Sequence, residues 1–371
     1  MAAEIESSMS RMAFAWLAAV LLAGCSSIDY YLQGIRGEMD ILDRAEPIPS
    51  VVETTQDAAL KAKLERAMAI REFASRELAL PDNGSYRNYA DLGRRFVLWN
   101  VFATPELSLD ARQWCFPIAG CVNYRGYFDE AEAKAEAAQI AASGDDVYIG
   151  GVPAFSTLGY FNDPILSTFV RYPEPELARL MFHELAHQVA YAKDDTVFNE
   201  SFAVAVEEEG VRRWLAAQND PALLAQAAAS ERYREGFRAL VERTREGLAR
   251  LYAGNGSNDA KRAGKAATFA AMRADYAALK QQWGGFAIYD GWFAQGPTNA
   301  SLAAVALYTS KVPLFRALLA QEGGDFPRFY ARVKELSRLP RPIRDQALEA
   351  AHPEGASAAT AGGAEVAGRT R

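Results

Sequence analysis

The sequence predicts an α+β fold that is predominantly α-helical, with a small mixed β-sheet followed by a helical region. Three observations lead to this prediction. Segments rich in aromatic and β-branched residues, typical of strands, occur in the first half of the chain. A helix-like segment separates two of them. Beyond residue 174, nearly the whole chain has apolar residues at helical spacing.

The elements of the first half follow from their local composition. After an irregular segment over residues 26–50, residues 55–78 have the pattern of an amphipathic helix, and the PDNGS cluster at 81–85 predicts a turn. Strands are predicted over 94–103, 122–128 and 146–155, and a helix over 129–142. The helix between strands suggests that these segments form one small sheet.

The second half is predicted to consist of helices over 174–192, 199–218, 229–253, 266–282 and 298–320. The sequence becomes low in complexity after residue 345, and residues 354–371 are rich in Ala and Gly without apolar anchors, so 347–371 are expected to be a disordered tail. We therefore expect one domain over 25–346.

The N-terminus has the architecture of a lipoprotein signal peptide over residues 1–24. Its apolar run at 12–24 is too short for a membrane span, and the sequence LAGC at 22–25 resembles a bacterial lipobox. Cys25 is thus the expected lipidation site. The alternative is an uncleaved apolar helix. Because Ser26 follows Cys25, the lipid anchor is expected to hold the protein at the bacterial outer membrane, facing the periplasm.

The net charge limits which binding partners are expected, and the cysteine content indicates how the cysteines pair. The net charge of −7, without any basic run, argues against nucleic-acid binding. Lipidation of Cys25 leaves Cys115 and Cys121, which an oxidising compartment would join in a disulfide. A thiolate metal site is the less favoured alternative, since no histidine or second cysteine pair lies nearby.

The segment HELAH contains two of the three histidines in the chain. On a helix, His183 and His187 project from the same face, so both can bind one metal ion. Neutral imidazoles suit zinc, and Glu184 is placed to hold and deprotonate a water molecule. The alternative is an ordinary buried helix, in which both imidazoles would need hydrogen-bond partners.

The third ligand is expected to be a carboxylate, because the remaining histidine, His352, lies at the border of the tail. Glu200, at the start of the next helix, completes the His₂Glu ligand set of catalytic zinc sites. Glu207 is the second candidate, either as a ligand or as the partner of an imidazole N–H. We expect one zinc ion.

HELAH followed by NESFA resembles the glutamate-type zincins, or gluzincins, although the spacing between the two motifs is shorter here. The segments CFPIAGCVNYRGYF, DVYIGGVPAFSTLGYFNDPILSTF and FNESFAVAVEEEGVRRW resemble a bacterial lipoprotein family named "putative aminopeptidases". This resemblance extends from the lipobox to about residue 345. It implies a zincin-like fold, a peptide substrate, and hydrolysis with Glu184 as general base.

The resemblance also implies a strand that pairs with the substrate backbone. Residues 150–159 stand in the right order for it, with Gly150 and Gly151 as substrate-binding residues; a plain turn is the alternative. The acidic G-x-M-E-N element that binds a free amine in related aminopeptidases is replaced by GGVPAF. Either Asp163, Glu207 or another carboxylate takes this role, or no free N-terminus is required.

An oxyanion donor is the last requirement. Tyr308 is the first candidate and Tyr289 the second, while Asn299 is expected either to bind substrate backbone or to cap a helix. The sequence therefore predicts a zinc-dependent peptidase of the periplasm. The alternative is a zincin-shaped lipoprotein that acts as a binding or assembly factor, but such a protein has no need of Glu184.

Overall fold

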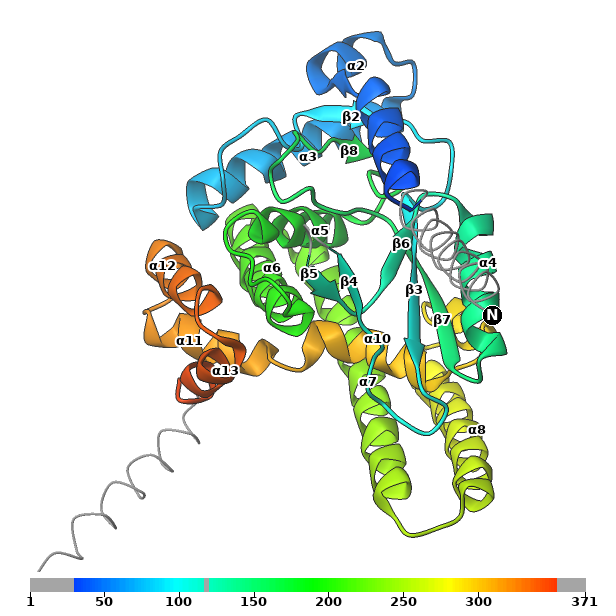
Figure 1. Cartoon of the computed structure of the whole chain (residues 1–371). Helices are drawn as coiled ribbons and strands as arrows, with labels where there is room; N and C mark the ends of the chain where they lie inside the picture. Colours follow the sequence, from blue (N-terminus) through cyan, green and yellow to red (C-terminus); the bar gives the residue numbers. More distant parts are fainter. Residues whose placement is uncertain (1–29, 117–119, 352–371) are drawn as a thin grey trace, which may run out of the picture.

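The computed structural model describes residues 30–116 and 120–351 (Figure 1). Helices dominate and the strands are short, which confirms the α+β, predominantly helical prediction. The three strands predicted from the sequence lie in one small sheet, and the described residues contain two further small sheets that were not predicted. Cys25 and residues 352–371, most of the predicted tail, lie outside the described part.

The sheets differ in their strand directions. In the first, β2 pairs antiparallel with β1 and parallel with β8, so this sheet is mixed. The second is antiparallel in the order β6-β3-β7, which leaves β7 at an edge, and the third is the pair β4-β5. The strands are β1 (Glu46–Pro47), β2 (Asn88–Ala90), β3 (Leu98–Thr104), β4 (Trp114–Phe116), β5 (Gly120–Val122), β6 (Arg125–Tyr127), β7 (Asp146–Val152) and β8 (Ile165–Leu166).

The prediction of an irregular segment over 26–50 is wrong for its described part, because residues 30–43 are helical. Local pattern gave no signal, since two glycines lower the helix propensity here. Tertiary contacts hold this helix: Tyr30 stacks on Phe116, with ring centroids 5.2 Å apart, and Gln33 hydrogen-bonds the backbone around β6. The other helices of the first half are α2 (Ile48–Thr54), α3 (Ala58–Leu78) and α4 (Glu130–Ala142).

The predicted helix over 298–320 is two helices, α10 and α11. Pro313 lies in the first turn of α11, where its missing N–H cannot continue the hydrogen bonds of α10, so a second helix begins there. The last helix ends at Glu349 with Leu348 fully buried, beyond the expected domain boundary. The helices of this half are α5 (Glu174–His187), α6 (Thr196–Gln218), α7 (Pro221–Ala253), α8 (Asn258–Gln282), α9 (Asp290–Ala294), α10 (Asn299–Thr309), α11 (Val312–Gln321), α12 (Phe326–Ser337) and α13 (Arg341–Glu349).

The main hydrophobic core lies around α5 and α6, which pack closely against each other and against α3 (Figure 1). A second core joins the antiparallel pair α7 and α8, through residues such as Phe237 and Met272. The stretch Asn299–Gln321 is apolar enough to span a membrane by length and composition. It packs instead as α10 and α11 on α6, with α10 also against β3, which is the behaviour of core helices.

Candidate metal centre

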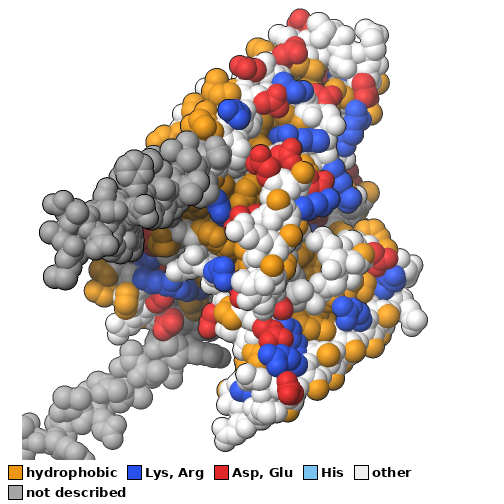
Figure 2. Space-filling view, turned by 45° about the vertical axis from the view of Figure 1, so that its right-hand side comes forward, with side chains coloured by type: hydrophobic (Ala, Val, Ile, Leu, Met, Phe, Trp, Pro, Cys, Tyr) orange, Lys and Arg blue, Asp and Glu red, His pale blue; other side chains and the backbone are white. Residues whose placement is uncertain are grey.

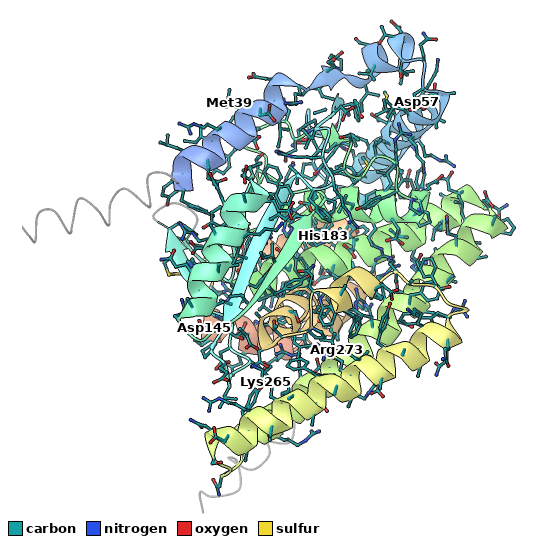
Figure 3. The ribbon with its side chains drawn as sticks, turned by 90° about the vertical axis from the view of Figure 1, so that its right-hand side faces the viewer. Met39, Asp57, Asp145, His183, Lys265 and Arg273 are labelled. Carbon is teal, nitrogen blue, oxygen red and sulfur yellow. A yellow bond between two sulfur atoms is a disulfide. The ribbon has the colours of Figure 1, made fainter. Side chains whose placement is uncertain are left out.

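Helix α5 carries His183, Glu184 and His187 in its last two turns. Pro175 and the acidic residues Glu174 and Glu176 occupy its first turn, where proline and negative charge favour a helix start. Phe182, Leu185 and Ala186 are completely buried between α3 and α6. This packing brings both histidines to Glu200 of α6, and Figure 3 shows His183 in the interior of the molecule.

Glu200 on α6 meets both histidines. Its Oε2 lies 3.2 Å from Nε2 of His183 and 3.6 Å from Nε2 of His187, and the two Nε2 atoms are 3.2 Å apart. One oxygen and two nitrogens from three side chains therefore converge on one point. The side chains are about nine-tenths buried, with exposed fractions of 9–10 %.

This donor set fits a zinc ion. Zinc bound tetrahedrally at about 2.1 Å places neighbouring ligand atoms roughly 3.4 Å apart, close to the observed separations. Two imidazoles and one carboxylate also form the ligand set of many catalytic zinc sites. The three residues expected from the sequence to bind the metal are thus the three that the fold brings together.

Glu207 contacts His183 on the side of the ring away from Glu200. Its Oε2 is 2.8 Å from Nδ1 of His183, and its Oε1 accepts a hydrogen bond from Arg179 at 3.0 Å. A proton on Nδ1 leaves Nε2 of His183 free to point at the metal position. Of the two roles considered for Glu207, the geometry selects the partner of an imidazole N–H.

The charges of the cluster stabilise one another. Burial lowers the pKa of His183, but its hydrogen bonds with Glu200 and Glu207 outweigh this effect and raise that pKa well above the ordinary value. Burial raises the pKa of Glu200, and the neighbouring histidines more than offset it, so that the pKa falls to about 2. Glu200 therefore stays ionised, as a metal ligand must.

Glu184 differs from the other carboxylates of the site. It is 7 % exposed, and burial raises its pKa above the ordinary value, despite the attraction of His183 and His187. A carboxylate that is less acidic than usual is a better proton acceptor near neutral pH. This environment suits a general base.

The short connection between α5 and α6 is held by side chains of the second helix. The Asn199 side chain both donates to the carbonyl oxygen of Ala192 and accepts from its N–H, at 2.9 and 2.7 Å. Asp195 caps α6 through the N–H of Phe198. Because these bonds close the turn over residues 188–195, Glu200 reaches the histidines in spite of the short spacing between HELAH and NESFA.

Tyr308, from α10, lies beside His183, His187 and Glu200, the three residues called the metal cluster below. Its ring centroid is 6.3 Å from that of His183, and burial, together with the charges of Glu200 and Glu184, raises its pKa well above the ordinary value. Tyr308 therefore remains protonated and able to donate a hydrogen bond.

Tyr124 was missed by the sequence reasoning. Burial and the charge of Glu200 raise its pKa well above the ordinary value, and its ring packs 5.6 Å from that of Phe102. Together with Tyr148 and Tyr308 it surrounds Phe102 in a half-buried aromatic cluster. Its only signal in the sequence was its place in the segment CVNYRGYF, which carried the family resemblance.

The glycine pair lies in β7, opposite Asn100 and Trp99 of β3. A Cβ on Gly151 would lie 2.3 Å from the ring of Phe96, so this glycine is required by packing. A Cβ on Gly150 would lie 3.3 Å from Tyr148 and 3.6 Å from Phe102, on the side of the aromatic cluster. Of the segment 150–159, only residues 150–152 are a strand, and residues 153–159 form bends and a turn, so each of the two alternatives describes part of the segment.

Other candidates have structural roles. Asn299 is fully buried, and its side chain donates to the carbonyl oxygen of Glu106 and accepts from the hydroxyl of Tyr252. It does not cap α10 either, because Thr298 does so. Tyr289 stacks on Phe237 in the second core, and Asp163 accepts hydrogen bonds from Thr157. These groups are therefore committed to the fold.

Cys115 and Cys121 form a disulfide between β4 and β5. The N–H of Cys121 donates to Asp194, in the turn between α5 and α6. The strand pair β4-β5 is thereby attached to the turn between α5 and α6, and the chain continues from β5 to Tyr124.

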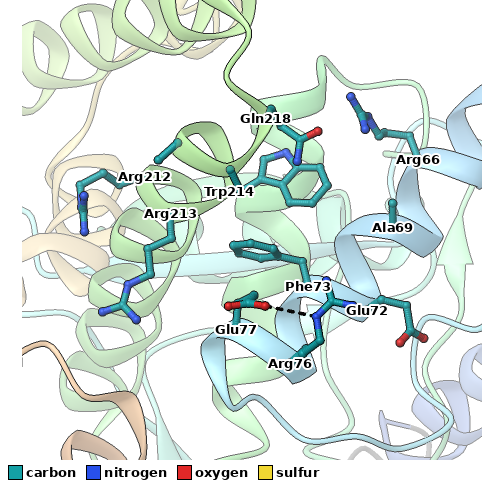
Figure 4. A pocket seen from close by; sticks show the side chains of 12 residues that line it. Arg66, Ala69, Glu72, Phe73, Arg76, Glu77, Arg212, Arg213, Trp214 and Gln218 are labelled. Atoms are coloured by element: carbon teal, nitrogen blue, oxygen red, sulfur yellow. Dashed lines mark hydrogen bonds and ion pairs between the residues drawn. The ribbon is translucent and has the colours of Figure 1, made fainter.

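A separate open cavity of about 820 Å³ lies between α3 and the end of α6 (Figure 4). Its lining includes Trp214 and several arginines, but no residue of the metal cluster. The arginines already have acidic partners; Arg76, for example, pairs with Glu77 at 3.1 Å.

The fold and the site define a predominantly helical α+β protein with a two-histidine, one-glutamate cluster on two packed helices. The chain belongs to the family described as "Putative aminopeptidase", whose model matches residues 29–348. This description points to a peptidase and hence to a peptide substrate. No curated protein and no solved structure matches the chain significantly.

Proposed function

We propose that this protein is a zinc-dependent, zincin-like peptidase that hydrolyses peptides in the bacterial periplasm. The observation that carries the proposal is the convergence of His183, His187 and Glu200 on one point, with Glu184 next to them. These three residues would hold one zinc ion. When bound there, zinc would supply a Lewis acid that polarises the substrate carbonyl and lowers the pKa of a water molecule.

Glu184 acts as the general base. Its buried carboxylate takes a proton from the attacking water and then delivers it to the amine that leaves when the peptide bond breaks. The raised pKa of Glu184 favours the first transfer, because a less acidic carboxyl group is a better proton acceptor. Glu207 keeps the proton of His183 on Nδ1 and so fixes the orientation of the ring.

Tyr308 donates a hydrogen bond to the oxygen on which negative charge develops, and Tyr124 is the second candidate for this role. Both tyrosines stay protonated because burial and nearby carboxylates raise their pKa values. The edge strand β7 binds extended substrate by main-chain pairing along its free side. Gly150 faces the aromatic cluster from this strand, so we assign substrate binding to Gly150 and only a packing role to Gly151.

A peptidase that acts only on peptides with a free N-terminus needs an acidic group near the site to bind the amine. Glu207 and Asp163, the two carboxylates considered for this role, already have protein partners. A comparison of peptides with free and acetylated N-termini decides between exopeptidase and endopeptidase action. We expect hydrolysis of both kinds.

We also propose that Cys25 is lipidated and anchors the protein at the outer membrane, facing the periplasm. The lipobox-like sequence LAGC supports this, and Cys25 itself lies outside the described residues. Palmitate labelling that is lost in Cys25→Ser tests the anchor. The same labelling in both proteins contradicts it.

The catalytic proposal is tested on protein lacking residues 1–25. Bound zinc is measured by mass spectrometry, and hydrolysis is measured on a broad peptide library. We expect one zinc per chain and cleavage by wild type, zinc without cleavage in Glu184→Gln, and loss of zinc in Glu200→Ala. Full zinc with no cleavage of any peptide by wild type would instead favour the binding or assembly factor.

A further inference from the structure

The helix over residues 30–43 exposes an apolar face. Leu32, Ile35 and Met39 have exposed fractions of 40, 59 and 47 %, and Tyr31 one of 37 %. The spacing of three and four residues places the first three on one side of the helix. Figure 2 shows hydrophobic side chains gathered at the upper left margin, where this helix lies, and Figure 3 places Met39 at the margin, away from His183.

The opposite face fixes the helix to the protein. Tyr30 stacks on Phe116, and Gln33 bonds the carbonyl oxygen of Gly126. Gly37 allows the ring of Phe128 to approach so closely that a Cβ would lie 2.1 Å from it. Ile41 is 1 % exposed. The helix therefore has a defined orientation, and its apolar face points away from the body of the protein.

The position of this helix in the chain suggests what covers its apolar face. Tyr30 follows Cys25 by five residues, and an extended chain of that length reaches about 18 Å at most. A lipid on Cys25 would therefore hold the start of the helix close to the bilayer surface. A partly apolar helix in that position lowers its free energy by placing its exposed side chains among the lipids.

We propose that the apolar face of helix 30–43 lies on the membrane, with Leu32, Ile35 and Met39 at the boundary between headgroups and acyl chains. This inference goes beyond the peptidase activity and rests on the proposed lipidation of Cys25. The polar residues of the helix include Arg36 and the acidic Asp40 and Asp43, so its charge is mixed. Apolar insertion, and not attraction to anionic lipid, is the expected mode of contact.

A second consequence concerns the orientation of the protein. The apolar face and the contacts of Gln33 and Gly37 with residues 126 and 128 lie on one rigid helix. Membrane contact through this helix therefore fixes the whole domain at one angle to the bilayer, which a flexible tether alone would not do.

The test uses full-length protein whose acylation has been verified by mass spectrometry, reconstituted into phosphatidylcholine liposomes. Ile35→Cys and Ile343→Cys are each labelled with the environment-sensitive dye NBD. Ile343, on α13, is a matched control because its exposed fraction is 53 %. The native Cys115 and Cys121 are joined in a disulfide and do not react with the label.

We expect the dye at position 35 to shift its emission to the blue by about 10 nm or more and to be quenched by nitroxide-labelled lipids. The dye at position 343 should do neither. An unshifted and unquenched dye at position 35 in acylated, liposome-bound protein overturns the proposal. So does a dye that is already shielded in the soluble protein lacking residues 1–25, measured in buffer without lipid or detergent, because another part of the chain or a second copy then covers this face.

These readouts do not depend on zinc or on catalysis, so failure of the proposed peptidase activity leaves them unaffected. Omitting phosphatidylserine in one series and including it in another tests the mode of contact. The blue shift should be the same in both.

Discussion

Nδ1 of His183 lies 2.8 Å from Oε2 of Glu207, on the side of the imidazole opposite the metal position. The second oxygen of Glu207 binds the half-buried Arg179, so that a line of three groups leads from this arginine through the buried Glu207 to the buried His183. This arrangement fixes the tautomer of His183, because only a protonated Nδ1 satisfies the carboxylate.

Glu207→Gln is therefore expected to weaken zinc binding by about 10- to 100-fold, since the imidazole loses its charged partner. Competition with a zinc chelator measures the affinity. Glu208→Gln is the control, because Glu208 pairs with Arg238 and Arg316 instead of a histidine. Equal zinc affinities in the two variants would contradict the role of Glu207.

Removal of the metal should destabilise the protein. A ligand present at a hundred times its Kd stabilises the folded state by about 2.7 kcal/mol, which corresponds to roughly 5 °C in Tm for a domain of this size. Thermal unfolding of wild type with and without chelator measures this difference. The chelator should have no effect on the Tm of His187→Ala, and the same decrease in that variant would argue against His187 as a ligand.

Gly150→Val tests substrate binding along β7. The added side chain has to displace Tyr148, whose ring lies 3.3 Å from the position of the new Cβ, and we expect kcat/KM for peptides to fall about tenfold, with a smaller loss of stability than in Gly151→Ala. Gly151→Ala should behave in the opposite way. Its Cβ would meet the ring of Phe96 at 2.3 Å, which costs about 1–3 kcal/mol of stability. Unchanged kinetics in Gly150→Val would remove Gly150 from the site.

Asp195 and Arg344 form a buried ion pair, with Nη2 of Arg344 2.7 Å from Oδ2 of Asp195. Arg344→Met leaves the carboxylate without its main partner at the start of α6 and should cost about 3–5 kcal/mol. Urea unfolding measures this loss. The exposed neighbour Arg341 lies 3.9 Å from the same oxygen, and Arg341→Met should change stability by less than about 0.5 kcal/mol. Similar losses in the two variants would contradict this assignment.

Glu38 makes stability depend on pH. Burial, with Asp163 nearby, raises its pKa from 4.5 to about 7 in the folded protein. The folded state therefore binds this proton more tightly than the unfolded state, so stability is lost as the pH rises from 4.5 to 7. Because Glu38 is only partly buried, we expect a loss of about 1–2 kcal/mol.

Glu38→Gln removes the carboxyl group whose ionisation lowers the stability of the folded protein. The variant should be more stable than wild type at pH 8, and the difference should disappear below pH 4.5. Denaturant unfolding at the two pH values measures it. A difference that does not change with pH would assign the effect to packing instead of ionisation.

The sequence was informative where local pattern and residue chemistry agree. The spacing of His183 and His187 on one helix, together with the scarcity of histidine, was enough to select Glu200 as the third ligand candidate. The helices α3 to α6 were predicted because their apolar residues recur at helical spacing. The helix over residues 30–43 was not predicted, since contacts with β6 and Phe116 stabilise it and the local pattern does not reveal such contacts.

The candidate site likewise contains residues whose role the sequence predicted and residues whose role it did not predict. The sequence left Glu207 with two possible roles and ranked Tyr289 and Asn299 among the site residues. It gave no chemical reason to choose Tyr124, because one tyrosine among sixteen carries little information. Only the packing of distant segments distinguishes these residues.

By itself, then, the sequence determined the class of fold, the residue types of the metal cluster and the order in which they occur. These properties depend on interactions between residues close together in the chain. The tertiary structure decided that Glu207 binds His183, that Asn299 serves the fold, and that Tyr124 joins Tyr308 beside the cluster. Those outcomes depend on how helices and strands far apart in the sequence pack, because packing determines which donors and acceptors lie within hydrogen-bond distance.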